Sequence, residues 1–69
     1  MPFVNIRLIK ELIADAPAEK KAEMTRRIAD AISDVTGLPV AEVWIVYDEV
    51  SENNWFLGHM SVKEFRAKK

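Results

Sequence analysis

The sequence predicts an α/β fold built from one strand–helix–strand (βαβ) unit with parallel strands, followed by a short C-terminal hairpin. Two segments rich in β-branched and apolar residues, 3–9 and 42–50, enclose a segment, 17–36, in which apolar residues recur at helical spacing. Two strands joined by a helix pair in parallel, almost always through a right-handed crossover. The 69 residues are expected to form a single small domain, residues 1–69.

The first strand, residues 3–9, has one apolar face and one mixed face, because alternate residues point to opposite sides of a sheet. The apolar face carries Val4, Ile6 and Leu8. The mixed face carries Phe3, Asn5, Arg7 and Ile9. The next segment, residues 10–16, suits either a helical turn or a loop, and its periodicity does not decide between them.

The helix is expected to run from about residue 17 to residue 36. Asp15 is the candidate N-cap, and Gly37 supplies the C-terminal stop. Glu23 and Arg27 lie one turn apart and are expected to pair. The buried stripe is expected to contain Met24, Ile28, Ile32 and Val35, with Ala31 beside them.

The second strand, residues 42–50, is apolar on both faces until Asp48. After it, residues 51–54 have the composition of a turn, and "WFLGHMSV" suits a short strand or hairpin. The basic segment "KEFRAKK", residues 63–69, is expected to trail off as a solvated end, the alternative being a docking patch for an anion.

One helix covers only one face of a two-stranded sheet, so the other face should carry uncovered apolar residues. These are Phe3, Ile9, Trp44 and Val46. Leaving a large apolar side chain in water forfeits roughly 1.5–3 kcal/mol of burial energy, and both strand edges would also stay open. We therefore expect two chains to join their sheets into a dimer, and such dimers to stack further.

The composition argues against several classes of protein. The net charge of −1 disfavours a nucleic-acid binder. No stretch approaches the ~18 apolar residues of a membrane span and no signal peptide is evident, so a cytoplasmic location is the default expectation. With no cysteine and one histidine in the chain, we expect neither a metal site nor a cofactor.

Pro2 stands directly before the first strand, where a proline is tolerated but where its nitrogen could also serve chemistry. If Met1 is removed, that nitrogen becomes a secondary amine, whereas with Met1 attached it is an amide with no basicity. An apolar pocket disfavours the charged ammonium and so lowers the pKa of the amine toward neutrality. A general base works best with a pKa near ambient pH, so Pro2 is a candidate proton shuttle.

Four segments of the chain, "PFVNIRL", "AISDVTGLP", "EVWIVYDEV" and "NNWFLGH", together resemble the 4-oxalocrotonate tautomerase family. The resemblance covers residues 2 to about 60. It implies a short chain of this fold that assembles as a homo-oligomer, a hexamer or another trimer of dimers. It also implies that the amino-terminal Pro2 is the general acid/base that moves a proton between oxygen and carbon in a small carboxylic acid.

The family commonly carries an Asn-Trp-x-x-Gly-Gly pattern after the second strand, which reads "NWFLGH" here. The resemblance places Trp55 at the aromatic position, where it would wall the substrate pocket, exclude water and keep the proline amine neutral. The alternative is an interface anchor, which is compatible if the pocket lies between subunits. His59 replaces the last glycine and is a candidate acid or electrophile, or else a loop histidine without chemistry.

The two arginines with which the family holds its substrate are absent from the corresponding positions. Lys10 is the nearest cation to the first position, and Trp44 occupies the second. Lys10 shares the Pro2 side of the strand by alternation, but a lysine does not reproduce the bidentate carboxylate recognition of an arginine. Arg7 has the opposite parity, so within one chain it should point away from Pro2 and would serve a neighbouring subunit's pocket.

Three functions fit these residues. The first is an isomerase that tautomerises an unsaturated or aryl 2-keto acid. The second is another branch of the superfamily, in which an activated water gives hydratase, dehalogenase or decarboxylase chemistry; such branches usually need a carboxylate together with arginines. The third is an oligomeric small-ligand binder that kept the fold and lost the chemistry. The missing arginines favour it, whereas the "MP" start and the "NW" segment count against it, and the isomerase is the leading hypothesis.

Overall fold

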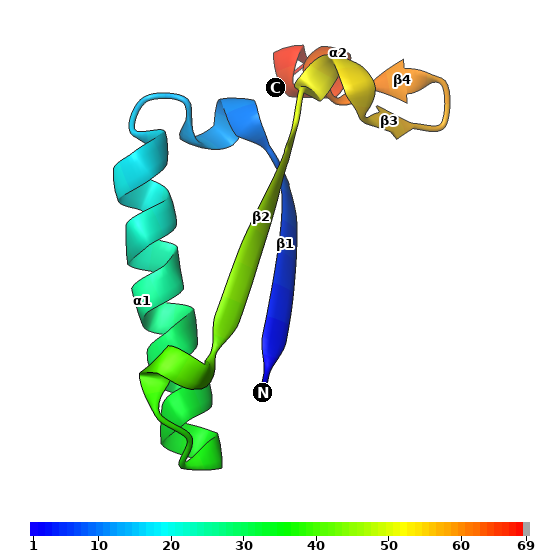
Figure 1. Cartoon of the computed structure of the whole chain (residues 1–69). Helices are drawn as coiled ribbons and strands as arrows, with labels where there is room; N and C mark the ends of the chain where they lie inside the picture. Colours follow the sequence, from blue (N-terminus) through cyan, green and yellow to red (C-terminus); the bar gives the residue numbers. More distant parts are fainter. Residues whose placement is uncertain (69) are drawn as a thin grey trace.

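The computed structural model describes residues 1–68 and has the expected strand–helix–strand order (Figure 1). The three main elements are β1 (Phe3–Ile9), α1 (Pro17–Thr36) and β2 (Trp44–Val50). β1 and β2 pair in parallel, with Phe3 opposite Trp44 and Ile9 opposite Val50. The predicted fold and helix bounds are confirmed. The second strand begins two residues later than expected, because a 3₁₀ turn, η2 (Val40–Glu42), precedes it.

The sequence of the segment between β1 and α1 suited either a helical turn or a loop, and the structure contains both. A 3₁₀ turn, η1 (Lys10–Ile13), is followed by a loop. The predicted N-cap of α1 is wrong, because Ala16 occupies that position and no side chain caps the helix. Asp15 lies one residue too early and instead accepts a 2.8 Å hydrogen bond from Lys20 Nζ. This bond lowers the pKa of the Asp15 carboxyl. Gly37 ends the helix as predicted, with a φ of 79° that glycine adopts without strain.

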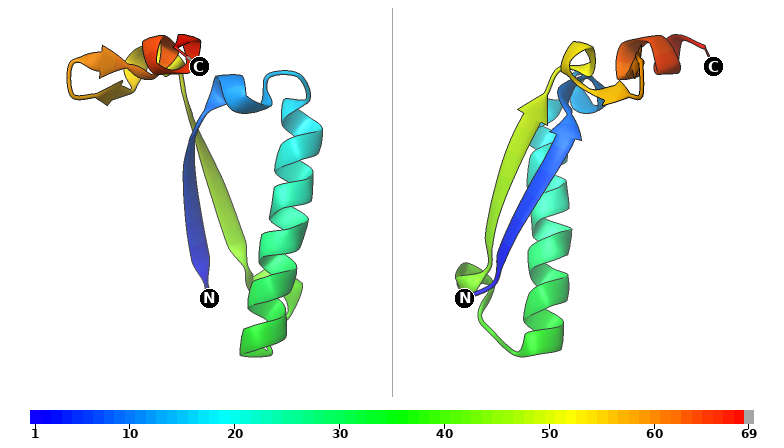
Figure 2. Two further views of the ribbon diagram at one scale, coloured as in Figure 1. Left: turned by 180° about the vertical axis from the view of Figure 1, so that it is seen from behind. Right: turned by 90° about the vertical axis from the view of Figure 1, so that its right-hand side faces the viewer.

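α1 lies along one face of the sheet (Figure 2). Its less exposed apolar side chains are Met24, Ile28, Ala29 and Ile32. The Tyr47 hydroxyl joins β2 to this helix, because it lies 2.7 Å from Thr25 Oγ1 and donates to the Lys21 carbonyl oxygen at 3.1 Å. Two residues predicted for the buried stripe are exposed instead, Ala31 and, at 88%, Val35. At about 100° per residue, Ala31 lies roughly 160° and Val35 roughly 120° around the helix from the buried Ala29, so both point away from the buried side.

Residues 51–68 form an arm that projects from the far end of the sheet (Figures 1 and 2). Its elements are η3 (Glu52–Asn54), β3 (Phe56–Leu57), β4 (Met60–Ser61) and α2 (Val62–Ala67). β3 and β4 pair antiparallel, which confirms the predicted hairpin. The basic segment does not trail off but is helical, because α2 begins with a capping box formed by Ser61 and Glu64. It is nevertheless solvated as expected, because residues 63–68 are exposed apart from the half-buried Arg66. The last residue of that tail, Lys69, lies outside the described residues.

The chain is more extended than a compact domain of its length. Its radius of gyration is 15.0 Å, against about 11 Å for a compact domain of this size. The apolar residues that are buried in the described part are Ile13, Ala29 and Val62. On the sheet face opposite α1, Phe3, Trp44 and Val46 are 60%, 54% and 44% exposed, whereas Ile9 is half-buried. The predicted uncovered face is therefore present.

Candidate active site

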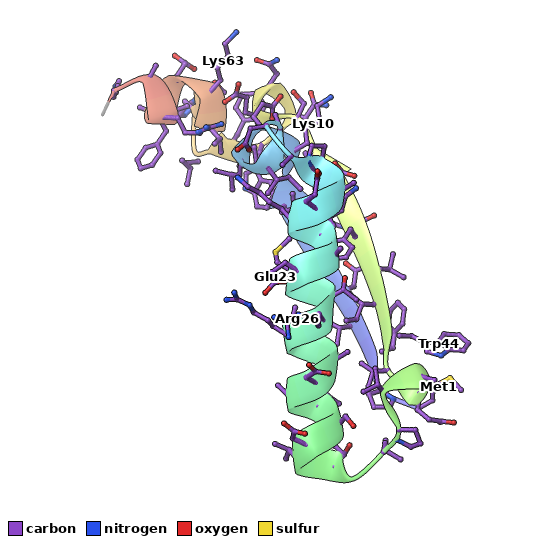
Figure 3. The ribbon with its side chains drawn as sticks, turned by 90° about the vertical axis from the view of Figure 1, so that its left-hand side faces the viewer. Met1, Lys10, Glu23, Arg26, Trp44 and Lys63 are labelled. Atoms are coloured by element: carbon purple, nitrogen blue, oxygen red, sulfur yellow. The ribbon has the colours of Figure 1, made fainter. Side chains whose placement is uncertain are left out.

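Pro2, the candidate base, lies at the N-terminal end of β1 and is held there by the sheet. Its carbonyl oxygen accepts a 3.0 Å hydrogen bond from the backbone N–H of Trp44, which extends the parallel ladder by one step. Pro2 is half-buried, whereas Met1 is 72% exposed. Figure 3 places Met1 and Trp44 at the same end of the molecule. The Pro2 nitrogen is thus fixed at the end of the sheet where the uncovered face is apolar.

Lys10 and His59, two of the predicted substrate contacts, lie far from Pro2 in the same chain. Lys10 begins η1 at the opposite end of β1, about 26 Å from Pro2 at the rise per residue of a strand. Figure 3 shows Lys10 and Met1 at opposite ends of the molecule. His59 lies in the turn between β3 and β4, and both side chains are exposed. A single chain therefore does not bring either of them to the candidate base.

An open hollow of about 510 Å³ lies where the arm leaves the sheet, at the C-terminal ends of β1 and β2. It is lined by Arg7, Asp48, Glu49, Val50, Asn54, Trp55 and Phe56. The structure therefore brings together two of the predicted site residues, Arg7 and Trp55, which are distant in the sequence. Both lie at the end of the sheet opposite to Pro2.

Arg7 and Asp48 form the charged wall of the hollow. They are cross-strand partners in the register of β1 and β2, and Arg7 Nη2 lies 3.4 Å from Asp48 Oδ2. This separation is long for a charge-assisted hydrogen bond, and the two side chains are 65% and 46% exposed. An exposed pair of this kind is worth at most about 1 kcal/mol. The guanidinium can therefore turn to an incoming carboxylate at little cost.

Two other lining residues, Glu49 and Trp55, are fixed by contacts with α1 and α2. Glu49 is paired with α1, because its Oε2 lies 2.6 Å from Lys21 Nζ. Trp55 is half-buried, and its carbonyl oxygen accepts a 2.7 Å hydrogen bond from the N–H of Val62 at the start of α2. The hollow thus combines one exchangeable guanidinium with two aromatic rings, those of Trp55 and Phe56, which suits an anion with an apolar body.

Sequence reasoning predicted only Arg7 and Trp55 among the lining residues, and the most informative residue that it missed is Asp48. The strand pattern shows that Asp48 and the adjacent Glu49 point to opposite faces and cannot act as a pair. The contact of Asp48 with Arg7 depends on the register of β1 against β2, which the sequence does not specify. The alternation of side chains along each strand could have indicated this contact, because it places Arg7 and Asp48 on the same sheet face, opposite the helix.

Within residues 1–68, no group of three or more His, Cys, Asp or Glu side chains is placed to hold a metal ion. In the same part of the chain, no helix is both long enough and apolar enough to cross a membrane.

Comparison with known proteins identifies the family. Residues 2–64 match the sequence model of the family described as "Tautomerase enzyme". The chain therefore belongs to the tautomerase family, and its resemblance to the 4-oxalocrotonate tautomerases is confirmed. The relatives are named as tautomerases, which indicates an isomerase.

The similar proteins match over nearly their full length. A probable tautomerase from Dickeya dadantii is 36% identical over 66 residues, covering 96% of this chain and 94% of that protein. The 2-hydroxymuconate tautomerase of Pseudomonas putida is 34% identical over 64 residues, covering 93% and 95%. The crystal structure of DmpI from Helicobacter pylori has a TM-score of 0.82 at 32% identity, covering 99% of this chain and 100% of that one. The heterohexamer 4-oxalocrotonate tautomerase from Chloroflexus aurantiacus has a TM-score of 0.77 at 29% identity, covering 96% and 100%.

Proposed function

We propose that this protein is a tautomerase that moves a proton between oxygen and carbon of an unsaturated or aryl 2-keto acid. Pro2 is the general acid/base after removal of Met1. The observation that carries the proposal is the family match, which begins at Pro2 and runs through Trp55 to residue 64. The hydrogen bond from Trp44 to the Pro2 carbonyl supports it, because it fixes the candidate amine at the end of the strand.

In the enol-to-keto direction, the neutral amine of Pro2 accepts the hydroxyl proton, and the resulting enolate shares its negative charge between oxygen and carbon. The prolinium then donates the proton to carbon, so the amine is neutral again at the end of the cycle. Arg7 binds the substrate carboxylate. Trp55 covers the pocket, and the resulting desolvation keeps the pKa of the amine near neutrality.

The proposed site is shared between chains. Pro2 lies at one end of β1 and the hollow with Arg7 and Trp55 at the other, so a complete site needs a second chain whose strands run in the opposite direction. We infer a homo-oligomer, at least a dimer and by preference a hexamer. The exposed apolar residues on the open sheet face support this inference. The Chloroflexus aurantiacus relative, which is described as a heterohexamer, supports it as well.

Lys10 and His59 are further candidates for contact with the substrate. Both are exposed, so both are accessible to a site in a neighbouring chain. In this proposal Lys10 is a second cation for the substrate carboxylate, and His59 is an acid beside the substrate carbonyl. Their roles depend on how the chains are arranged in the oligomer.

The decisive experiment compares the wild type with Pro2→Ala, both shown by intact mass to lack Met1. The substrates are an enolised aryl pyruvate and a 2-hydroxydienoate. Pro2→Ala should lower the rate on the order of 10²–10⁴-fold, the usual worth of a positioned acid/base group. Wild-type activity should rise with pH, because only the neutral amine can accept a proton. Equal rates in the two processed proteins would rule out the mechanism, as would uniform retention of Met1 in the native host.

The water-adding branch of the superfamily is the second candidate, and the contact between Arg7 and Asp48 is the observation that favours it. The hollow holds a carboxylate beside one arginine, which is part of the combination that such chemistry usually needs. Asp48 would accept a proton from the attacking water. A product one water heavier than the substrate, lost in Asp48→Asn, would establish the hydratase form of this branch. Turnover to an isomer of unchanged mass would exclude it.

A further inference from the structure

The arm that carries Trp55 is joined to the rest of the chain by one covalent connection, after Val50. Its elements pack mainly against one another rather than against the strand–helix–strand unit (Figures 1 and 2). Apolar packing alone therefore does not set the angle at which the arm leaves the sheet. The position of Trp55 at the hollow must depend on polar contacts at the base of the arm.

Three charged side chains meet at the base of the arm: Glu11, Glu52 and Arg66. Glu11 joins the arm to the strand–helix–strand unit, whereas Glu52 and Arg66 join two elements within the arm. Glu11 lies in η1, and its Oε1 accepts the backbone N–H of Glu52 at 2.9 Å. Glu52 begins η3, and its own Oε1 accepts a 2.9 Å hydrogen bond from Arg66 Nη1 in α2. The three residues therefore form a continuous polar path from η1, through the base of the arm, to the C-terminal helix.

Together with the pair of Lys21 and Glu49, the pair of Glu52 and Arg66 is among the better shielded ion pairs of residues 1–68. The side chain of Glu52 is 19% exposed and that of Arg66 is 36% exposed. By comparison, Glu23 and Arg26 on α1 are 46% and 60% exposed. Solvent screens a half-buried ion pair less than an exposed one. The attraction between Glu52 and Arg66 is therefore stronger than that between Glu23 and Arg26.

Backbone hydrogen bonds link the position of Glu52 to that of Trp55. The N–H of Asn54 donates to the Ser51 carbonyl at 2.8 Å, which closes the turn η3 around Glu52. The Trp55 carbonyl accepts the N–H of Val62 at 2.7 Å, which ties Trp55 to α2. A displacement of Glu52 would therefore carry Trp55 with it.

We propose that Glu11, Glu52 and Arg66 form a latch that fixes the arm and thereby positions Trp55 at the hollow. They are positioning residues, because none of the three is among the residues that line the hollow. The latch acts on the reaction through Trp55. Its effect on activity rests on the proposed function, whereas its effect on the position of Trp55 does not.

The first test reads the latch without any assay of activity. The chain has two tryptophans, so Trp44→Phe leaves Trp55 as the single indole fluorophore. In that background, Glu11→Ala removes the acceptor of the Glu52 N–H, and the Trp55 emission should shift to longer wavelength with faster quenching by acrylamide. Glu11→Gln keeps an Oε1 acceptor and should restore the parent spectrum. Arg66→Met breaks the other half of the latch and should shift the emission in the same direction.

The matched control is Glu23→Ala, which removes a carboxylate from ion pairs on α1 and should leave the Trp55 spectrum unchanged. Unchanged spectra in both Glu11→Ala and Arg66→Met would show that there is no latch. A Glu11→Gln spectrum that matches Glu11→Ala instead of the parent would also overturn the proposal, because the hydrogen bond would then not be the cause.

The second test is a double-mutant cycle on activity, with Trp44 intact. Glu11→Ala should lower kcat/KM roughly three- to tenfold, as expected for the loss of one charge-assisted hydrogen bond. In a Trp55→Ala background the same change should have little further effect, because the latch acts through Trp55. Additive losses would overturn the positioning role. If the wild type shows no tautomerase activity, the proposed function fails, and the fluorescence result still decides whether the latch exists.

Discussion

In the proposed function, the contact with the substrate carboxylate depends on single residues. Arg7 shares the hollow with Trp55, whereas Lys10 lies in η1 and is not among the lining residues. An arginine also forms two parallel hydrogen bonds with a carboxylate, which a lysine does not. Arg7 is therefore the stronger candidate for the carboxylate contact, although Lys10 is nearer to the position at which the family carries an arginine.

We predict that Arg7→Met raises KM for acidic substrates about tenfold or more and leaves neutral analogues unaffected, because a charge-assisted contact with the carboxylate is lost. Asp48→Asn should lower KM for the same acids, because it removes the group that competes for the guanidinium. Steady-state kinetics on an acid and its amide measure both effects. Lys10→Ala is the matched control, and a larger effect of that change would return the carboxylate role to Lys10.

Among the elements, α1 carries a cluster of charges on its solvent-facing side. Glu23 Oε2 accepts hydrogen bonds from Arg26 Nη2 and from Arg27 Nε, each at 2.6 Å, and the second of these is the pair that the sequence predicts. These bonds, first from Arg26 and then from Arg27, lower the pKa of Glu23 from 4.5 to about 2. Because the pKa is lower in the folded chain, the stabilisation is complete above about pH 4.5 and is lost as the pH falls toward 2.

Glu23→Gln should therefore lower the urea midpoint of unfolding at neutral pH and make progressively less difference as the pH falls below 4.5. The difference should be small and should shrink in high salt, because the side chains are exposed. Urea titrations of both proteins at pH 7 and pH 3 measure it. A difference that grows on acidification would contradict the assignment of the low pKa to Glu23.

The attachment of α1 to β2 depends on Tyr47. Its one hydroxyl hydrogen is donated to the Lys21 carbonyl, so Thr25 Oγ1 is the donor in the 2.7 Å contact. Tyr47→Phe keeps the ring and removes both bonds, and we predict a loss of about 1–3 kcal/mol in the free energy of unfolding. Thr25→Val removes one bond and should cost less. An unchanged urea midpoint in Tyr47→Phe would show that the hydroxyl does not contribute.

Elements could be predicted from the sequence where local signals specify them. Alternation identified β1, and Pro17 with Gly37 bounded α1 correctly, because backbone restrictions at these residues act locally. The prediction of Asp15 as the N-cap is wrong, because the N-cap is the last residue with non-helical dihedral angles before the helix, and that residue is Ala16. Ala31 and Val35 were misassigned because the buried side of α1 depends on its rotation against the sheet, which is a tertiary property.

At the scale of the whole molecule, the candidate site could be predicted only in part. Because alternate residues of a strand point to opposite faces, the sequence predicts that Arg7 and Pro2 lie on different faces. In the structure, Arg7 lies on the face away from α1. Its meeting with Asp48 and Trp55 depends on strand register and on the direction of the arm, which no local pattern specifies. Whether Pro2 meets these groups depends on contacts between chains, so a single sequence pattern cannot predict it.

The uncovered sheet face predicts assembly. We expect the chain to sediment as a hexamer, or at least as a dimer, at micromolar concentration, because Val46 and its apolar neighbours are exposed on that face. Val46→Lys would bury a charge at the contact and should dissociate the oligomer. Val35→Lys changes a side chain that is 88% exposed on α1 and should leave it intact. Sedimentation velocity measures both, and a folded wild-type monomer at that concentration would contradict the prediction.

A site shared between chains also predicts that two defective variants complement each other. Pro2→Ala chains lack the base but keep Trp55, and Trp55→Ala chains lack the pocket wall but keep Pro2. If the two groups come from different chains, about a quarter of the sites in a randomly mixed oligomer combine an intact Pro2 with an intact Trp55. Co-refolded mixtures should therefore exceed the mean activity of the two parents, with a maximum at equal amounts. If each site lay within one chain, every site would carry one of the two defects and mixing would recover nothing.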